Sequence, residues 1–358
     1  MKSKSLTILC CILLTGCSKS PETNPEILWD SYGVPHIYAD NYNDLFYAYG
    51  WSQMRNHGNL LLKLYGQARG QGAEYFGEKH LKSDQWVHTH NITQRSLDWW
   101  EKQDPDIRKM MTAFTDGIND YANENPDEID DLNQSILPAR PEDCFSHFQR
   151  VILFHFVTNP GIATFNPASI IKDRGSNTWA IGPSRSESGN AMLIANPHLP
   201  WFDMFTWFEA HTISHDLNAY GAGLVGMPFL GIAFNDYMGW SHTNNVHDGQ
   251  DLYELTLIDD GYQWGDGIQH FDERTVEIKV RNDDGNMTAS EFLIRESVHG
   301  PVVSEKDGKA YALRVVGLDQ PHVFRQYFDM ARAKTLKSFQ DAIRPLQNPY
   351  FTIMYADK

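Results

Sequence analysis

The chain has 358 residues, of which 41% are hydrophobic and 13% aromatic, and a formal net charge of −16 at pH 7. It is long and apolar enough to bury the core of one large domain or of two, and this composition excludes a disordered or fibrous protein. The negative charge would repel phosphate groups and no Lys- or Arg-rich run offsets it, so nucleic-acid binding is excluded as well.

The first 17 residues are typical of an export signal rather than of the fold. Lys2 and Lys4 precede an apolar run at residues 6–14, and Leu14-Thr15-Gly16-Cys17 places small residues before a cysteine. This end resembles a bacterial lipobox, which implies cleavage before Cys17, acylation of Cys17, and a protein held by lipid in the bacterial cell envelope, facing the periplasm or the exterior. An ordinary secretory signal is the alternative, and either one exports the protein.

The cysteines agree with this interpretation. Cys10 and Cys11 would leave with the signal and Cys17 would carry lipid, so only Cys144 would remain in the mature chain. No intramolecular disulfide is then possible, and stability must come from packing. We expect Cys144 to be a small core residue, because no neighbouring group in the sequence would stabilise its thiolate.

Residues 18–156 are predicted to be mainly helical. After two short strands at 27–30 and 35–39, apolar residues recur with helical spacing over 43–64 and 107–121. A further helix is predicted from about 141 to 156, with acidic residues in its first turn, where they favour the helix dipole.

From residue 176 onward, short alternating or apolar runs separated by Gly and Pro predict a sheet-rich region over 176–358. Residues 157–175, rich in Asn, Pro, Gly and Ala, form the spacer between the two regions. The last run, 350–358, is strand-like and nothing closes it, so we expect the sheet-rich region to be incomplete at its C-terminus. The expected strands are 178–181, 191–195, 207–213, 219–223, 230–234, 238–242, 251–258, 276–280, 292–296 and 311–315, with a helix at 336–343.

Several motifs occur in one order along the chain and together resemble the penicillin amidase family of N-terminal-nucleophile hydrolases. The resemblance extends over about residues 26–358. The motifs are Tyr32-Gly33-Val34-Pro35-His36-Ile37, Gly175-Ser176-Asn177-Thr178-Trp179-Ala180, Ser188-Gly189-Asn190-Ala191-Met192-Leu193, Ala195-Asn196-Pro197-His198-Leu199-Pro200, Pro228 with its apolar neighbours, Gly239-Trp240-Ser241-His242-Thr243-Asn244 and His299-Gly300-Pro301-Val302.

The resemblance implies an α+β fold, the αββα sandwich of these hydrolases, and a precursor that cuts itself between Gly175 and Ser176. A helical α-chain would precede a sheet-bearing β-chain. Independently of the family, a serine hydroxyl needs a base near neutrality. The freed α-amine of Ser176, with a pKa near ~7.7–8 against ~10.4 for lysine, could be that base through a bridging water.

The resemblance also assigns the groups around the nucleophile. The backbone N–H of Asn244 matches an oxyanion donor, and such a donor contributes roughly 3 kcal/mol. His198 matches the residue that steadies the amine and hydroxyl of Ser176. The family's second donor, an asparagine side chain, is expected beyond Lys358.

Asp248, Asp251 and the backbone of Gln250 resemble the family's calcium site, and carboxylates with a carbonyl are ligands that calcium takes. Two solvated aspartates in a polar loop are the alternative. No organic cofactor is implied.

The sequence therefore predicts a self-processing hydrolase of linear amides that acts on an N-acylated small molecule of the penicillin type. An acyl-homoserine lactone or a lipopeptide is the alternative substrate, and a non-catalytic surface binding protein that kept the fold is the alternative from another class. Apolar residues expected to contact the acyl group are Leu199, Trp201, Phe202, Phe229 and residues 154–156.

Overall fold

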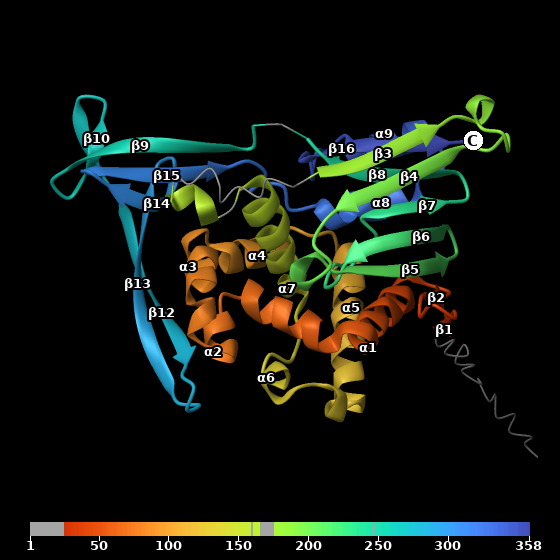
Figure 1. The fold of residues 1–358 in the computed structure, drawn as a ribbon, viewed down its shortest axis with the longest axis horizontal. Helices are drawn as coiled ribbons and strands as arrows, with labels where there is room; N and C mark the ends of the chain where they lie inside the picture. The colour runs from red at the N-terminus through yellow and green to blue at the C-terminus, as the bar shows by residue number, and fades with distance from the viewer. Residues whose placement is uncertain (1–24, 159, 165–174, 246–247) are drawn as a thin grey trace, which may run out of the picture.

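Figure 1 shows a computed structural model of the protein, which describes residues 25–158, 160–164, 175–245 and 248–358. The predicted signal segment with Cys17 and most of the spacer 157–175 lie outside these residues. Within the described residues, no helix is both long enough and apolar enough to cross a membrane.

The N-terminal half is a helical layer, as predicted. Its longest helices, α1 and α5, cross closely because Gly50 and Gly117 leave no room for a side chain; a Cβ at either would collide with the backbone carbonyl of Phe114 or Tyr47. The helices are α1 (Tyr42–Ala68), α2 (Gly72–Phe76), α3 (Leu81–Thr89), α4 (Ile92–Glu101), α5 (Pro105–Glu124), α6 (Asp131–Gln134) and α7 (Pro141–Phe148), with a π-helix at Gln149–Val157 and 3-10 turns at Glu78–His80, Pro126–Glu128 and Pro160–Thr164.

A seven-stranded sheet lies against this layer in the order β1-β2-β5-β6-β7-β8-β16. The β2–β5 pairing is parallel, whereas β5–β6, β6–β7, β7–β8 and β8–β16 are antiparallel. Phe208 and Ala210 on β5 and Trp240 on β8 are buried in the core. The strands are β1 (Glu26–Trp29), β2 (Pro35–Tyr38), β5 (Trp207–Ser214), β6 (Leu217–Leu224), β7 (Ile232–Asn235), β8 (Met238–Asn244) and β16 (Phe351–Asp357).

Two later helices, α8 (Val323–Arg332) and α9 (Leu336–Ile343), complete the helical layer. Phe328 on α8 contacts Tyr42 on α1, and Phe339 on α9 contacts Trp240 and Tyr355 of the sheet. The helix α9 was predicted, whereas α8 was not.

A second seven-stranded sheet extends away from the first at the left of Figure 1 in the order β11-β10-β9-β15-β14-β13-β12. Its far end packs on α2 through a small cluster of Ala73, Ile278 and Val280. The strands are β9 (Gln250–Ile258), β10 (Gly261–Trp264), β11 (Gly267–His270), β12 (Asp272–Arg281), β13 (Met287–Ser297), β14 (Gly300–Lys306) and β15 (Lys309–Val315). The sequence did not predict β10, β11 or β14.

A two-stranded sheet of β3 (Gly175–Ile181) and β4 (Met192–His198) lies over β8, with short turns at Pro183–Arg185 and Asp203–Phe205 after its strands. Gly239 on β8 faces this sheet, because a Cβ there would approach Leu193 on β4. Apart from the second seven-stranded sheet, the described residues thus form three layers: helices, the β1–β16 sheet and the β3–β4 sheet. The predicted α+β class is confirmed, and an outer helical layer over β3–β4 is not among the residues described.

Cys144 on α7 is fully buried, as predicted, and burial raises the pKa of its thiol. The helix expected over 141–156 changes to a π-helix after Phe148. This segment presents Phe148, Ile152 and Phe156 to the cavity described next.

Candidate active site

A cavity of about 620 Å³ lies where β3, the end of β8 and the π-helix meet. Its walls are mainly apolar, and its polar side chains include Ser176, His242, Asn244, Tyr327 and Asn348. A mainly apolar recess with a few polar groups is the usual form of a small-molecule site.

Ser176 is the second residue of β3 and faces Pro197 across the β3–β4 pair. Its side chain is half-buried at the cavity wall, and its Oγ donates a hydrogen bond of 2.6 Å to the carbonyl oxygen of Gly175. The chain is continuous here, so the nitrogen of Ser176 belongs to the peptide bond with Gly175. The hydroxyl therefore lies beside the bond that the sequence predicts to be cut.

Asn244 is the last residue of β8 and is paired with Phe351 on β16. It lines the same cavity as Ser176. The structure thus brings together two of the three predicted catalytic residues, although they are separated by 68 positions in the chain (244 minus 176).

His198, the third, lies at the end of β4 and pairs with Gly175 rather than with Ser176. It is exposed and is not among the cavity-lining residues. Asn177 Nδ2 lies within hydrogen-bond distance of His198 Nε2, at 3.0 Å. His198 thus neighbours the predicted cut but does not contact the hydroxyl of Ser176 through a hydrogen bond in the described residues.

The predicted calcium ligands lie at the start of β9 and just before it. Asp248 and Asp251 are exposed and Gln250 is half-buried. Asp248 and Gln250 line an open cleft of about 2740 Å³ that also reaches Ser176. The side-chain oxygen Oε1 of Gln250 is buried without a hydrogen-bond partner in the described residues.

Within the described ranges, no group of three or more His, Cys, Asp or Glu side chains could hold a metal ion. Asp248 and the unpartnered amide oxygen of Gln250 are oxygen donors of the kind that calcium prefers. Asp251 follows Gln250 on β9 and does not line the cleft, because successive side chains of a strand point to opposite faces.

The apolar residues expected around the acyl group divide into two sets. Leu199, Phe229 and Phe156 line the cavity. Trp201 and Phe202 are 97% and 69% exposed and lie outside it. Phe154 is buried against His90 instead.

Sequence reasoning missed a polar network in the cavity wall. Asn348 Nδ2 donates to Tyr327 Oη over 2.8 Å, and Tyr327 Oη lies 3.1 Å from His242 Nε2. Burial lowers the pKa of His242 to about 4 and raises that of Tyr327, so both side chains are neutral at pH 7. His242 stands in one of the quoted motifs, but no sequence pattern linked it with Tyr327 or Asn348.

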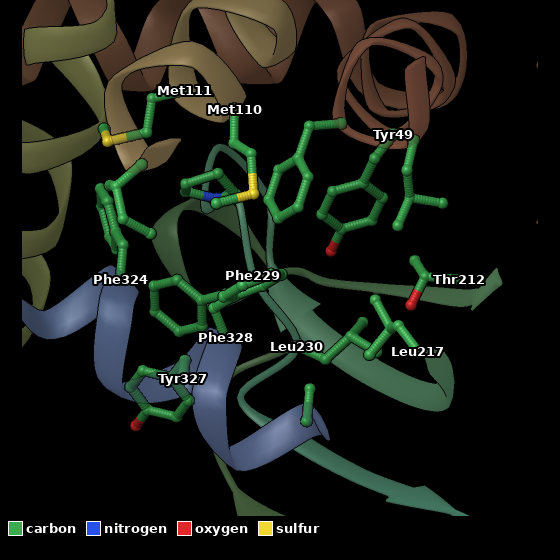
Figure 2. Close-up of a pocket in the computed structure, with 15 residues that line it drawn as sticks. Tyr49, Met110, Met111, Thr212, Leu217, Phe229, Leu230, Phe324, Tyr327 and Phe328 are labelled. Atoms are coloured by element: carbon green, nitrogen blue, oxygen red, sulfur yellow. The ribbon is translucent and has the colours of Figure 1, made fainter. Parts of the chain in front are cut away.

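A second apolar cavity of about 570 Å³ lies behind the first, between α1, α5 and α8 (Figure 2). The two cavities share Phe229 and Tyr327, whose rings stack with centroids 4.2 Å apart and planes 11° apart. Figure 2 shows the hydroxyl of Tyr327 turned away from this second cavity. The stacked pair therefore forms the wall between the two apolar spaces.

Comparison with known proteins identifies relatives over nearly the whole chain. A family model described as Penicillin amidase matches residues 24–358. The acyl-homoserine lactone acylase PvdQ of Pseudomonas fluorescens Pf-5 is 28% identical over 383 residues, covering 94% of this chain and 49% of that protein. The acyl-homoserine lactone acylase QuiP of Pseudomonas aeruginosa PAO1 is 24% identical and covers 94% of this chain and 48% of that protein.

The chain thus spans about half the length of the curated relatives it matches. Among solved structures, a thermostable penicillin G acylase from Alcaligenes faecalis aligns with a TM-score of 0.45 and 23% identity, over 51% of this chain and 33% of that one.

Proposed function

This chain belongs to the penicillin amidase family of N-terminal-nucleophile hydrolases, and we propose that the protein hydrolyses a linear amide of an N-acylated small molecule. The observation that carries the proposal is the meeting of Ser176 and Asn244 on one apolar cavity. The cavity would hold the acyl group and present its carbonyl carbon to Ser176.

The precursor first cuts the bond between Gly175 and Ser176, which frees the α-amine of Ser176. Ser176 Oγ then attacks the substrate's amide carbon, and its proton passes to that amine through a water molecule. The protonated amine gives the proton to the leaving nitrogen as the carbon–nitrogen bond breaks. A water molecule then attacks the acyl-enzyme and gives its proton to the amine of Ser176. The acid is released as Ser176 Oγ takes a proton back from that amine.

The negative charge on the attacked oxygen requires donors that are already in place. We assign one of them to the backbone N–H of Asn244, at the end of β8. His198, held by Asn177 next to Gly175, would steady the freed amine once the chain is cut. Both assignments are supported by position and by the family motif.

Two classes of substrate fit an apolar cavity, namely penicillin-type amides and acyl-homoserine lactones. The names of the relatives that match 94% of this chain favour an acyl-homoserine lactone. A panel of both classes, assayed for release of the acid, decides between them.

N-terminal sequencing of the full-length protein tests the proposal as a whole. We expect two chains, the second of which begins at Ser176. A first chain that is blocked to sequencing because Cys17 is acylated would support export and lipid anchoring in the cell envelope. One intact chain with Ser176 internal would contradict self-processing and favour a non-catalytic binding protein.

The stacked wall between the two cavities predicts a change in chain-length preference. Phe229→Ala removes one ring of the pair and should join the two apolar spaces. We expect the best substrate to shift to an acyl chain several carbon atoms longer, measured as kcat/KM over a homologous series. An unchanged optimum would mean that the second cavity does not accept the acyl group.

We also propose that Asp248, Asp251 and Gln250 bind a structural calcium ion. Calcium at about 100 times its Kd would stabilise the folded protein by about 2.7 kcal/mol, and a chelator would remove that gain. Thermal unfolding with calcium and with chelator measures the difference. Asp248→Asn combined with Asp251→Asn should abolish it, whereas the exposed Asp283→Asn should not; equal Tm values in wild type would contradict the site.

A further inference from the structure

The polar network in the cavity wall ends at Asn348, whose side chain is almost fully buried, with the residue 4% exposed. Asn348 lines both the acyl cavity and the open cleft, as do Ser176 and Asn244. Residues shared by the two spaces lie at their junction, which is the end of the cavity nearest the nucleophile. Asn348 therefore neighbours the first carbon atoms of a bound acyl group rather than its far end.

The hydrogen bonds of this network run in one direction. When the neutral ring of His242 carries its proton on Nδ1, its Nε2 accepts the proton of Tyr327 Oη. Tyr327 Oη in turn accepts from Asn348 Nδ2. At one end of the network, the carbonyl of Gly231 favours the protonated form of His242, but burial outweighs that effect and Nδ1 has no hydrogen-bond partner in the described residues.

At the other end, Asn348 Oδ1 has no hydrogen-bond partner in the described part of the chain. With the proton of Tyr327 Oη given to His242, a rotated amide would bring Oδ1 against an oxygen that has no proton to offer, so Nδ2 stays toward Tyr327. Oδ1 is an acceptor on a residue that lines the cavity, so a ligand group that comes within reach of it satisfies it only by supplying a donor.

We propose that Asn348 Oδ1 accepts a hydrogen bond from a hydroxyl group on carbon 2 or 3 of the acyl chain, and that the protein selects amides of hydroxy acids. This rests on the proposed role of Ser176 as the nucleophile. An unsubstituted chain would leave Oδ1 buried and unpaired, and a keto oxygen at the same position would add a second acceptor facing it.

A matched series tests the preference: unsubstituted, hydroxy and oxo acyl groups of one length on one leaving amine. We expect kcat/KM for the hydroxy substrate to exceed that for the unsubstituted one by roughly tenfold to a hundredfold, with the oxo substrate no better than the unsubstituted one. Equal rates, or a preference for the oxo compound, would overturn the proposal.

Calorimetric binding of the corresponding free acids provides a readout that does not depend on catalysis. Tighter binding of the hydroxy acid supports the proposal even if no amide is hydrolysed, and equal binding overturns it. Failure of the proposed function is therefore distinguished from failure of this inference, because the first abolishes hydrolysis of the whole series and the second abolishes only the preference.

Variants locate the preference in the network. Asn348→Leu should reduce the ratio of kcat/KM for the hydroxy and unsubstituted substrates to about one. Tyr327→Phe frees the amide to rotate and should lower the same ratio, which provides a second test if the leucine variant does not fold. Asn43→Leu, in the exposed first turn of α1, is the matched control and should keep the wild-type ratio. A wild-type ratio in a folded Asn348→Leu or Tyr327→Phe protein would overturn the assignment.

Discussion

The Ser176→Ala variant is expected to remain one uncut chain and to lose amide hydrolysis by about 10⁴-fold or more, the scale seen when a nucleophile is removed. The change removes the hydroxyl that contacts the Gly175 carbonyl in the intact chain. It also leaves no nucleophile at the cavity wall if the chain were cut by other means. Gel mobility and N-terminal sequencing measure the cutting, and acid release measures the hydrolysis.

The control for this change is Ser184→Ala, in the exposed turn after β3. It alters the same functional group and should leave cutting and hydrolysis at wild-type levels. Ser176→Cys keeps a nucleophile at the site and should retain part of the cutting. A Ser176→Ala protein that is still cut and still hydrolyses amides would place the nucleophile elsewhere.

The parts of the fold that follow from local pattern were predicted well. On α5, the residues with helical spacing, Ile107, Met110, Met111, Phe114 and Ile118, are all buried. The apolar spacing alone was enough to predict this helix, because all of these side chains lie on the face that packs on α1. The sequence placed Ser176 just before a strand expected at 178–181; in the structure β3 begins at Gly175 and includes the serine, at the wall of the cavity.

Tertiary contacts decided the features that were missed. The helical spacing was predicted over 43–64, yet α1 continues through Gly66 to Ala68, and Ile136 and Tyr75 would contact any side chain at Gly66. Trp201 and Phe202 were expected at the acyl group because they are apolar, but an apolar residue near a motif need not be buried.

The polar network shows the same limit at the site. His242, Tyr327 and Asn348 come from β8, α8 and the segment before β16, and their sequence separations carry no periodicity. Only the fold brings their polar atoms within hydrogen-bond distance. A prediction of substrate preference therefore needed the structure, whereas the prediction of the nucleophile did not.

Asp143→Ala is expected to lower the free energy of unfolding by about 3–5 kcal/mol, because it leaves the guanidinium of Arg69 buried without its charged partner. The Arg69 and Asp143 side chains are only 10% and 5% exposed. Arg69 Nε and Nη2 donate to the two carboxylate oxygens over 2.8 and 2.7 Å. Asp143 also accepts from the backbone N–H of Arg140, at the start of α7.

This pair joins the end of α1 to the start of α7, and Arg69 also donates to the carbonyls of Ile136 and Pro138. The helix α7 continues into the π-helix that carries Ile152 and Phe156. Loss of the Arg69–Asp143 pair should therefore loosen the cavity wall as well as the core. Arg69→Met combined with Asp143→Leu removes both charges and should cost less than Asp143→Ala alone.

Urea unfolding of these variants in the uncut Ser176→Ala background measures the differences on one covalent chain. Asp341→Ala breaks the exposed pair with Lys337 and serves as the control, for which we expect no measurable loss, since water and salt screen exposed pairs. Equal losses for Asp143→Ala and Asp341→Ala would contradict a structural role for the buried pair. If the double variant is less stable than Asp143→Ala, the expectation is wrong. The attraction between Arg69 and Asp143 would then exceed the free energy that it costs to bury their charges.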